Sequence, residues 1–247
     1  MHVFGIDIGG TGIKGAPVDV ETGALLEARL KFDTPRPATP DAMAPVVKEL
    51  TSSFGWTGPI GSTFPAVVTD GTIRTASNVD ASWIGTDAKA LLSKVTGSNV
   101  TVLNDADAAG IAEMTFGAGK GEDGPVLMLT FGTGIGTALF IRGQLYPNTE
   151  LGRVEFNGHI AEHRASEHAK QAHDLSWSRW AKRVSEYMQY MERLLSPELI
   201  IVGGGISRQS EKFLPLITGV NARIVPAAML NDAGIVGAAM AAAKAAG

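Results

Sequence analysis

The stretch GIDIGGTGIKG at residues 5–15 decides how this sequence is interpreted. It contains the pattern G-x-G-x-x-G at Gly10, Gly12 and Gly15, and it begins with an apolar run that is typical of a β-strand. Asp33 stands roughly 20 residues further on, near where a dinucleotide-binding unit places its acidic residue. The stretch is therefore compatible with a nicotinamide enzyme, but also with a glycine turn of another kind.

The residues after this turn argue against dinucleotide binding. A Rossmann loop must open a helix, because the N-terminus of that helix binds the pyrophosphate. Gly15 and Pro17 stand where the first helical turns would be, and both residue types disfavour a helix interior. A turn at residues 21–23 and a partly alternating segment at residues 25–32 follow. The sequence therefore predicts a β-meander, with the glycines in a hairpin.

A glycine hairpin of this kind can hold phosphate. Glycines let the backbone approach a ligand closely, and their N–H groups can form an anion nest. Asp7 leads into the turn and could hold a hydrated Mg²⁺, whereas the alternative is a tight hairpin with Asp7 as a turn former. The candidate phosphate-donor residues of this loop are Asp7, Gly9, Gly10, Thr11, Gly12 and Lys14.

The composition excludes several classes of protein. The 247 residues are 45% hydrophobic and 19% charged, which favours a sizeable core and disfavours disorder. The net charge of −4 gives no bulk basic field for nucleic acid. The absence of cysteine excludes disulfides and any zinc site built on thiolates. No apolar run approaches the roughly 18 residues of a membrane span, so we expect a cytoplasmic protein with no membrane partner.

Two strand–glycine turn–strand units recur, IDIGGTGIKGAPV and MLTFGTGIGTALF, about 122 residues apart. This repeat predicts a duplicated α/β fold whose two halves face each other across a cleft. We expect one domain over residues 1–104, with an alanine-rich terminal helix at 232–247 packing back on it. The larger domain is expected over 105–231, with residues 161–195 mostly helical.

Five ordered stretches resemble one enzyme family: GIDIGGTGIKG, LNDADAAG, LTFGTGIG, TELG and IIVGGGIS. They resemble the ROK family of sugar kinases, within the hexokinase–actin–Hsp70 superfamily, and the resemblance covers nearly the whole chain. It implies two ribonuclease-H-like (actin-like ATPase) domains around a central cleft. The segments DTPRPATPDAM, FPAVVTDGTIRTASNVDASWIG, FGAGKG and DLSWSRWAKRVSEYM are more similar to the polyphosphate-dependent glucokinases of that family. This closer resemblance implies phosphoryl transfer from polyphosphate or ATP to glucose with Mg²⁺, with mannose as a second candidate acceptor.

The resemblance also assigns roles to single residues. Asp105 matches the family's general base, which would take the proton of the sugar's 6-hydroxyl; the alternative is that Asp105 only caps the following helix. Glu150 and Glu162 match glutamates that bind the sugar ring. Asn78 matches a third sugar contact, and Asn104, next to Asp105, can donate and accept hydrogen bonds at a sugar hydroxyl. The remaining residues matched to the phosphate donor are Thr133, Gly134, Gly204 and Gly205.

Two features depart from the family pattern. Most ROK proteins carry a zinc site of one His and three Cys, and without cysteine this chain is expected to hold no zinc. The TELG stretch is usually followed by His, whereas here Arg153 follows. Arg153 could reach the sugar, pair with Glu150 or Glu155, or swing out.

Alternatives to a polyphosphate glucokinase remain open at this stage. One is a strictly ATP-dependent ROK hexokinase for glucose, fructose or an amino sugar. A different class is a non-catalytic sugar-binding regulator, which an intact Asp105 and two intact glycine turns disfavour. The resemblance also implies a homodimer. Its interface could involve the helices that carry Trp177, Trp180, Tyr187 and Met188, or these side chains could fill the core.

Overall fold

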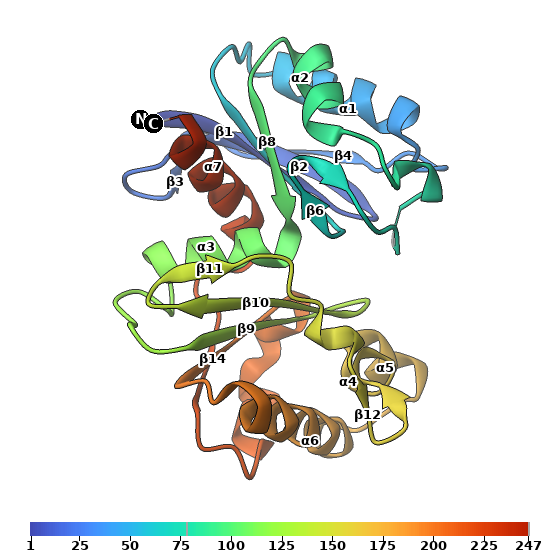
Figure 1. Cartoon of the computed structure of the whole chain (residues 1–247), viewed down its shortest axis with the longest axis vertical. Coiled ribbons are helices and arrows are strands. Elements are labelled where there is room, and N and C mark those ends of the chain that lie inside the picture. Colours follow the sequence, from blue (N-terminus) through green and yellow to red (C-terminus); the bar gives the residue numbers. More distant parts are fainter. Residues whose placement is uncertain (78, 247) are drawn as a thin grey trace. The chain divides into compact units, whose positions relative to one another are not determined.

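The computed structural model describes residues 1–77 and 79–246, which divide into two compact units (Figure 1). The first unit comprises Met1–Ala112 and Asp232–Gly247, and the second comprises Glu113–Asn231. The sequence placed the first boundary after Asn104, whereas the units divide after Ala112. The helix α3 (Asp105–Phe116) therefore begins in the first unit and ends in the second.

Within the described residues, six strands form the sheet of the first unit, in the order β3-β2-β1-β5-β8 with β4 also paired to β2. The first hairpin is antiparallel, and β1, β5 and β8 run parallel to one another. The segment at 25–32 was predicted as one strand but forms parts of two short ones, β3 and β4. The strands are β1 (His2–Ile8), β2 (Gly12–Asp19), β3 (Ala24–Leu25), β4 (Leu30–Asp33), β5 (Ile60–Phe64) and β8 (Val100–Asn104).

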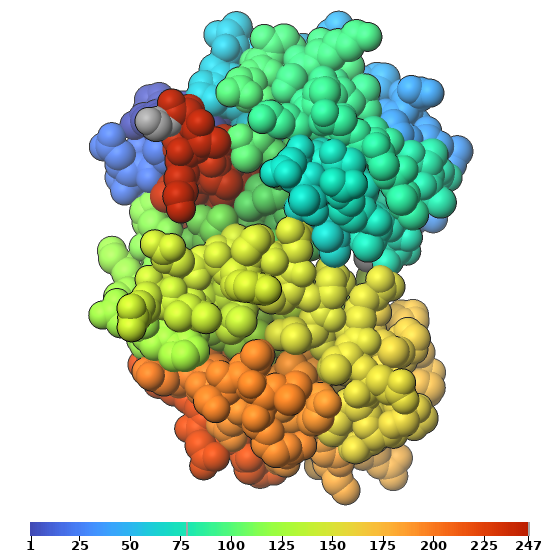
Figure 2. Space-filling view, viewed as in Figure 1, coloured from blue at the N-terminus to red at the C-terminus, as the bar shows by residue number. Residues whose placement is uncertain are grey.

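The terminal helix α7 (Ala233–Ala246) packs on β1 and β5, and its end reaches the surface beside the N-terminal segment (Figure 2). Small residues make this contact close. A Cβ on Gly61 would collide with the backbone of Ala238, and a Cβ on Gly5 would collide with the carbonyl of Ile235. The alanine-rich composition of α7 thus allows the helix to approach the sheet at backbone distance, where glycine is required.

The opposite face of this sheet carries the core of the first unit. Phe4 packs against Phe54 and Trp56, and Phe64 packs against Trp83. Two helices that contact each other cover this region. They are α1 (Pro40–Ser52), which is capped by Thr39, and α2 (Ala88–Thr96), which is capped by Asp87. A short hairpin around residues 70–71 forms from β6 (Val68–Thr69) and β7 (Thr72–Ile73).

The sheet of the second unit repeats the topology of the first. In the described chain, five strands lie in the order β11-β10-β9-β14-β15. The first three are antiparallel neighbours, and β9, β14 and β15 are parallel. This repeat bears out the duplication predicted from the two glycine turns. The strands are β9 (Val126–Phe131), β10 (Ile135–Ile141), β11 (Gln144–Tyr146), β14 (Leu199–Gly203) and β15 (Arg223–Pro226).

The long helix α6 (Trp177–Leu195) fills the core of the second unit. Trp180, Tyr187 and Met188 are buried there, and Trp177 is partly buried against the same cluster. Of the two roles considered for these side chains, core packing is the one observed.

The remaining elements are α4 (Ala161–Ala165), α5 (Glu167–Ala172), β12 (Glu155–Phe156), β13 (His159–Ile160) and the 3-10 segments Ala81–Trp83, Leu151–Arg153, Gly205–Lys212, Leu214–Leu216 and Leu230–Asp232. None of the helices in the described ranges is long and apolar enough to cross a membrane.

Candidate active site

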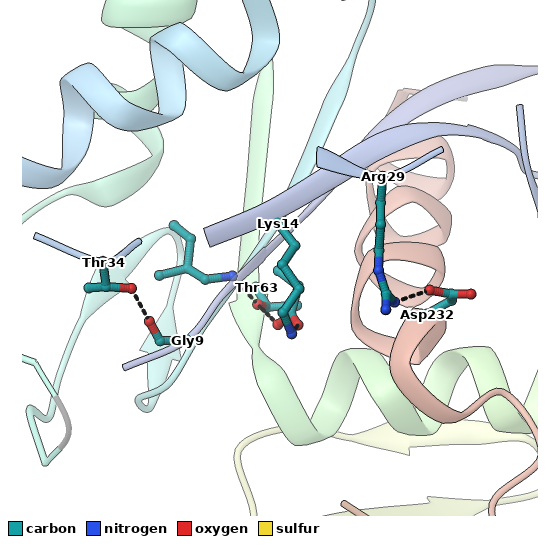
Figure 3. A network of polar contacts seen from close by, with 8 residues as sticks. Gly9, Lys14, Arg29, Thr34, Thr63 and Asp232 are labelled. Atoms are coloured by element: carbon teal, nitrogen blue, oxygen red, sulfur yellow. Dashed lines mark hydrogen bonds and ion pairs between the residues drawn. The ribbon is translucent and has the colours of Figure 1, made fainter. Parts of the chain in front are cut away.

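The glycine loop at the N-terminus forms a hairpin, as predicted. Ile8 pairs with Ile13 in the antiparallel ladder, and the N–H of Gly9 donates to the carbonyl of Gly12 at 3.0 Å. The hydroxyl of Thr34, which follows β4, donates to the carbonyl of Gly9 at 2.6 Å (Figure 3). Because a strand follows the turn where a Rossmann loop would need a helix, the nicotinamide interpretation is excluded.

Asp7 is held on both carboxylate oxygens beside this turn. Lys14 lies opposite Asp7 in the ladder, and its Nζ is 3.2 Å from Oδ2. The buried hydroxyl of Thr63 donates to Oδ1 at 3.1 Å and accepts from the N–H of Ile8 at 3.0 Å (Figure 3). Thr63 comes from β5 and was not predicted from the sequence. Asp7 is therefore a fixed, partly exposed carboxylate beside the turn.

The start of α7 lies against Asp7. A Cβ on Gly234 would stand 3.0 Å from the carboxyl carbon of Asp7, so this position in the helix has no room for a larger residue. Just before α7, Asp232 forms an ion pair with Arg29 (Figure 3). The positive end of a helix backbone favours nearby negative charge. The region around Asp7 thus combines a lysine, a helix N-terminus and the glycine turn.

These residues fit a hydrated Mg²⁺ that arrives with a phosphate. In the part of the chain that the structure describes, no group of three or more His, Cys, Asp or Glu side chains could hold a metal ion. Mg²⁺ usually keeps several waters and is bound through one or two carboxylates together with substrate phosphates. A single carboxylate at Asp7 satisfies that requirement, whereas a dedicated ion cage would need more ligands.

The junction between β8 and α3 bears on the two roles considered for Asp105. The buried side chain of Asn104 accepts through Oδ1 from the N–H groups of Ala106 at 2.8 Å and Asp107 at 3.1 Å. Its Nδ2 donates to the carbonyl of Ala66 at 3.1 Å. Asn104 therefore caps the helix. Asp105 is exposed in the first turn, and its Oδ1 also accepts from Ala106 at 2.9 Å. Its carboxylate is not needed as the cap.

In the second unit, two glycine turns lie next to each other. Gly132 donates its N–H to the carbonyl of Gly134 at 3.0 Å and closes the turn between β9 and β10, with Thr133 exposed at its tip. Gly204 follows β14 with a φ of 85°, and a Cβ there would collide with the backbone of Phe131, the last residue of β9. The predicted donor residues of this unit therefore gather at one end of its sheet.

Glu162 contacts the first of these turns. Its Oε2 accepts from the N–H of Ile135 at 3.2 Å, and a Cβ on Gly134 would collide with the same oxygen. Its Oε1 lies 3.8 Å from Nε of Arg153, a pairing that the sequence did not predict. Glu162, expected as a sugar ligand, thus also fixes the backbone of the expected phosphate turn.

Glu150 belongs to the same group of charges. The hydroxyl of Thr137 donates to the carbonyl of Thr149 at 2.6 Å and accepts from the N–H of Leu151 at 3.2 Å, which holds the chain on either side of Glu150. Desolvation raises the pKa of the Glu150 carboxyl, the charge of Arg153 lowers it, and the charge of Glu162 raises it. Carboxylates accept hydrogen bonds from hydroxyls and guanidinium groups donate them, so this group can bind a polyhydroxyl compound.

One buried carboxylate was missed by the sequence analysis. Glu113 is fully buried, and its oxygens accept from the N–H groups of Ala118 at 2.8 Å, Ala228 at 3.1 Å and Met229 at 2.7 Å. The one signal in the sequence is an acidic residue within an otherwise apolar helical run.

Asn78, which was predicted as a sugar contact, lies outside the described residues.

Comparisons with known proteins agree with this geometry. Residues 3–169 match the ROK family. The polyphosphate glucokinase of Mycobacterium tuberculosis (strain CDC 1551 / Oshkosh) is 52% identical over 241 residues, which cover 97% of this chain and 91% of that protein. The crystal structure of inorganic polyphosphate/ATP-glucomannokinase from Arthrobacter sp. strain KM has a TM-score of 0.95 at 46% identity and covers 99% of both chains.

A more distant structure shares the fold. The ROK family glucokinase from Streptomyces griseus, solved in complex with glucose and AMPPNP, has a TM-score of 0.83 at 24% identity, over 99% of this chain and 100% of that chain. The predicted α/β class, with two actin-like domains, is confirmed by these structures and by the repeated sheet topology.

Proposed function

This chain belongs to the ROK family, and on that premise we propose that it is a sugar kinase that transfers a phosphoryl group from inorganic polyphosphate to the 6-hydroxyl of glucose. The observation that carries this proposal is the similarity, over nearly the whole chain, to enzymes that are named for polyphosphate. ATP is the second donor that we propose and mannose the second acceptor, because the Arthrobacter enzyme is named for both.

Asp105 is proposed as the general base. Its carboxylate would take the proton of the 6-hydroxyl while that oxygen forms a bond to the terminal phosphorus. The bond between this phosphorus and the bridging oxygen breaks, and the polyphosphate leaves one phosphate shorter. A base in this position contributes about 10²- to 10⁴-fold to the rate. The capping of α3 by Asn104 supports this role, because the helix does not depend on the Asp105 carboxylate for its cap.

The glycine turns are proposed to bind the donor. Backbone N–H groups at Gly10–Gly12 and the ammonium of Lys14 would bind its phosphate oxygens, Thr11 adds a hydroxyl, and Gly9 closes the turn through its own N–H. In the second unit, Thr133, Gly134, Gly204 and Gly205 are proposed to do the same. Mg²⁺, held through water by Asp7, would neutralise charge on the phosphates when bound.

The sugar is proposed to bind to the acidic group of the second unit. Glu150 and Glu162 would each accept hydrogen bonds from ring hydroxyls, and Arg153 would donate one. Asn104 and Asn78 complete the proposed set. Because Arg153 already pairs with Glu162, it orients that carboxylate even when it does not touch the sugar.

The test is the formation of glucose 6-phosphate by purified protein with Mg²⁺, comparing ATP with polyphosphate that has been freed of nucleotide. The Asp105→Asn variant, prepared in parallel, reports any contaminating kinase. Turnover with polyphosphate is expected. Turnover with ATP alone would favour the ATP-dependent hexokinase alternative. Sugar binding with no turnover on glucose, mannose, fructose or amino sugars would favour the non-catalytic regulator.

We also propose a homodimer that works in the cytoplasm. The support for the dimer is the family resemblance alone. Trp180, Tyr187 and Met188 do not add to it, because they pack in the core of their own unit. Light scattering at micromolar concentration tests the dimer, and a monomer mass would refute it. Cell fractionation tests the compartment.

A further inference from the structure

Lys31 lies over the N-terminal glycine turn, although nothing in the local sequence singles it out. It belongs to β4, which pairs with β2 so that Lys31 stands directly opposite Lys14 and Asp33 stands opposite Gly12. A Cβ placed on Gly12 would lie 2.5 Å from Cε and 3.5 Å from Cγ of Lys31. The side chain of Lys31 therefore runs from its place beside Lys14 toward the turn at Gly9–Gly12, with its ammonium one bond further on.

Gly12 makes this course possible. The position that any other side chain would occupy at residue 12 is filled by the aliphatic part of Lys31. The φ of Gly12 is not positive, so its backbone conformation does not itself require glycine. The space that Lys31 needs is a sufficient reason for a glycine at this position.

Two lysines directly opposite each other in an antiparallel pair repel, unless other charges compensate them. The charged groups on this face are Asp7 from β1, Lys14 from β2, Arg29 before β4, Lys31 and Asp33 from β4, and Asp232 before α7. Asp7 pairs with Lys14, and Asp232 pairs with Arg29.

Among the described residues, the side chain of Lys31 makes no hydrogen bond or ion pair, and Asp33 lies within ion-pair distance of neither lysine. Lys31 is thus an exposed cation without a partner in that part of the chain, beside a second cation and a turn of backbone N–H groups. An anion with several charges would relieve this repulsion.

We propose that Lys31 binds the phosphate groups of the donor that are not transferred, with Gly12 as the residue that admits it. The ligand is an oligophosphate or polyphosphate anion, and this inference rests on the proposed function for its physiological donor. Lys14 and Lys31 then face one phosphate chain from two adjacent strands. Lys31 is a donor-binding residue and takes no part in proton transfer.

The test measures binding of inorganic tripolyphosphate by calorimetry for Lys31→Gln and for Lys48→Gln as the matched control. Lys48 is an exposed lysine on α1 in the same unit, and its replacement makes the same change in charge. Loss of a charge-assisted contact is expected to weaken tripolyphosphate binding by about fivefold to tenfold in Lys31→Gln. Lys48→Gln should match the parent, and both variants should unfold at the parent's temperature.

A second variant tests the part played by Gly12. Gly12→Ala pushes Lys31 off the turn, so it should weaken tripolyphosphate binding to a similar extent. Adding Lys31→Gln to it should then have little further effect. Equal affinities for Lys31→Gln and Lys48→Gln, or a parent protein that does not bind tripolyphosphate, would overturn the proposal.

Kinetics separate this inference from the proposed function. If the parent turns over polyphosphate and Lys31→Gln keeps its donor KM, the function stands and the inference fails. If the parent binds tripolyphosphate through Lys31 but forms no glucose 6-phosphate, the inference stands and the function fails. When both hold, the donor KM rises, the glucose KM is unchanged, and donor affinity depends less steeply on salt.

Discussion

Replacing Asp105 with Asn should separate catalysis from stability. In the structure Asn104, and not Asp105, accepts from the N–H groups of both Ala106 and Asp107. The amide oxygen of the substituted side chain can still accept from Ala106, so the main change in the first turn of α3 is the loss of a negative charge. Such a charge is worth about 0.3–1 kcal/mol. The unfolding temperature should therefore fall by no more than about 4 °C.

The effect on turnover should be far larger. An amide cannot take the proton of the 6-hydroxyl, and loss of a general base lowers kcat by at least about 10²-fold, which corresponds to about 2.7 kcal/mol in the barrier. Glucose binding should survive, because the variant keeps a polar side chain of the same size. The assays are kcat at saturating polyphosphate and glucose, glucose binding by calorimetry, and thermal unfolding.

Asn104→Ala is the matched control, because it should do the opposite to stability. It removes the cap from two N–H groups of α3 and leaves the carbonyl of Ala66 without its donor. Loss of a buried cap of this kind costs about 1–3 kcal/mol. Near-normal turnover in Asp105→Asn would remove Asp105 as the base. Destabilisation of Asp105→Asn to the level of Asn104→Ala would show that its carboxylate holds the helix after all.

Four further variants, at three residues, test the second unit. Since desolvation raises the pKa of Glu150 above its usual 4.5, the ionised carboxyl disfavours the folded state at neutral pH. The protonated carboxyl of Glu150 contributes a stability that is fully present below about pH 4.5 and is lost as the pH rises through the raised pKa. Glu150→Gln should therefore unfold at a higher temperature than the parent at pH 7, and the difference in unfolding temperature should shrink as the pH is lowered. A difference that does not depend on pH would contradict this. Glu162→Ala should raise the KM for both glucose and donor, because Glu162 also holds the N–H of Ile135, whereas Glu162→Gln should change the donor KM less. A change in the glucose KM alone would limit Glu162 to the sugar. Glu113→Ala removes a buried carboxylate that accepts from three part-buried N–H groups, and it should lower the free energy of unfolding by about 1–3 kcal/mol in urea titrations. A loss well below about 1 kcal/mol would mean that water replaces the carboxylate.

Local residue chemistry was sufficient to determine the outline of the fold. Gly15 and Pro17 disfavour a helix after the first glycine turn, so the hairpin could be predicted without any tertiary information. The second turn, at residues 132–134, has the same pattern, and this repeat predicted the duplication that the two sheets display. The alanine-rich terminal segment likewise indicated the existence of α7.

The partners of the site residues were decided only by the tertiary structure. Asn and Asp cap helices about equally well, so the sequence could not say which of residues 104 and 105 caps α3. Thr63 reaches Asp7 from a strand 56 positions away in the chain. Lys31 reaches Gly12 through a strand pairing that its own segment does not signal. Local sequence patterns indicate whether a segment is a helix or a strand and which residues end it. The contacts of Thr63 and Lys31 depend instead on strand order and register, which are set when the apolar faces of the sheets are buried.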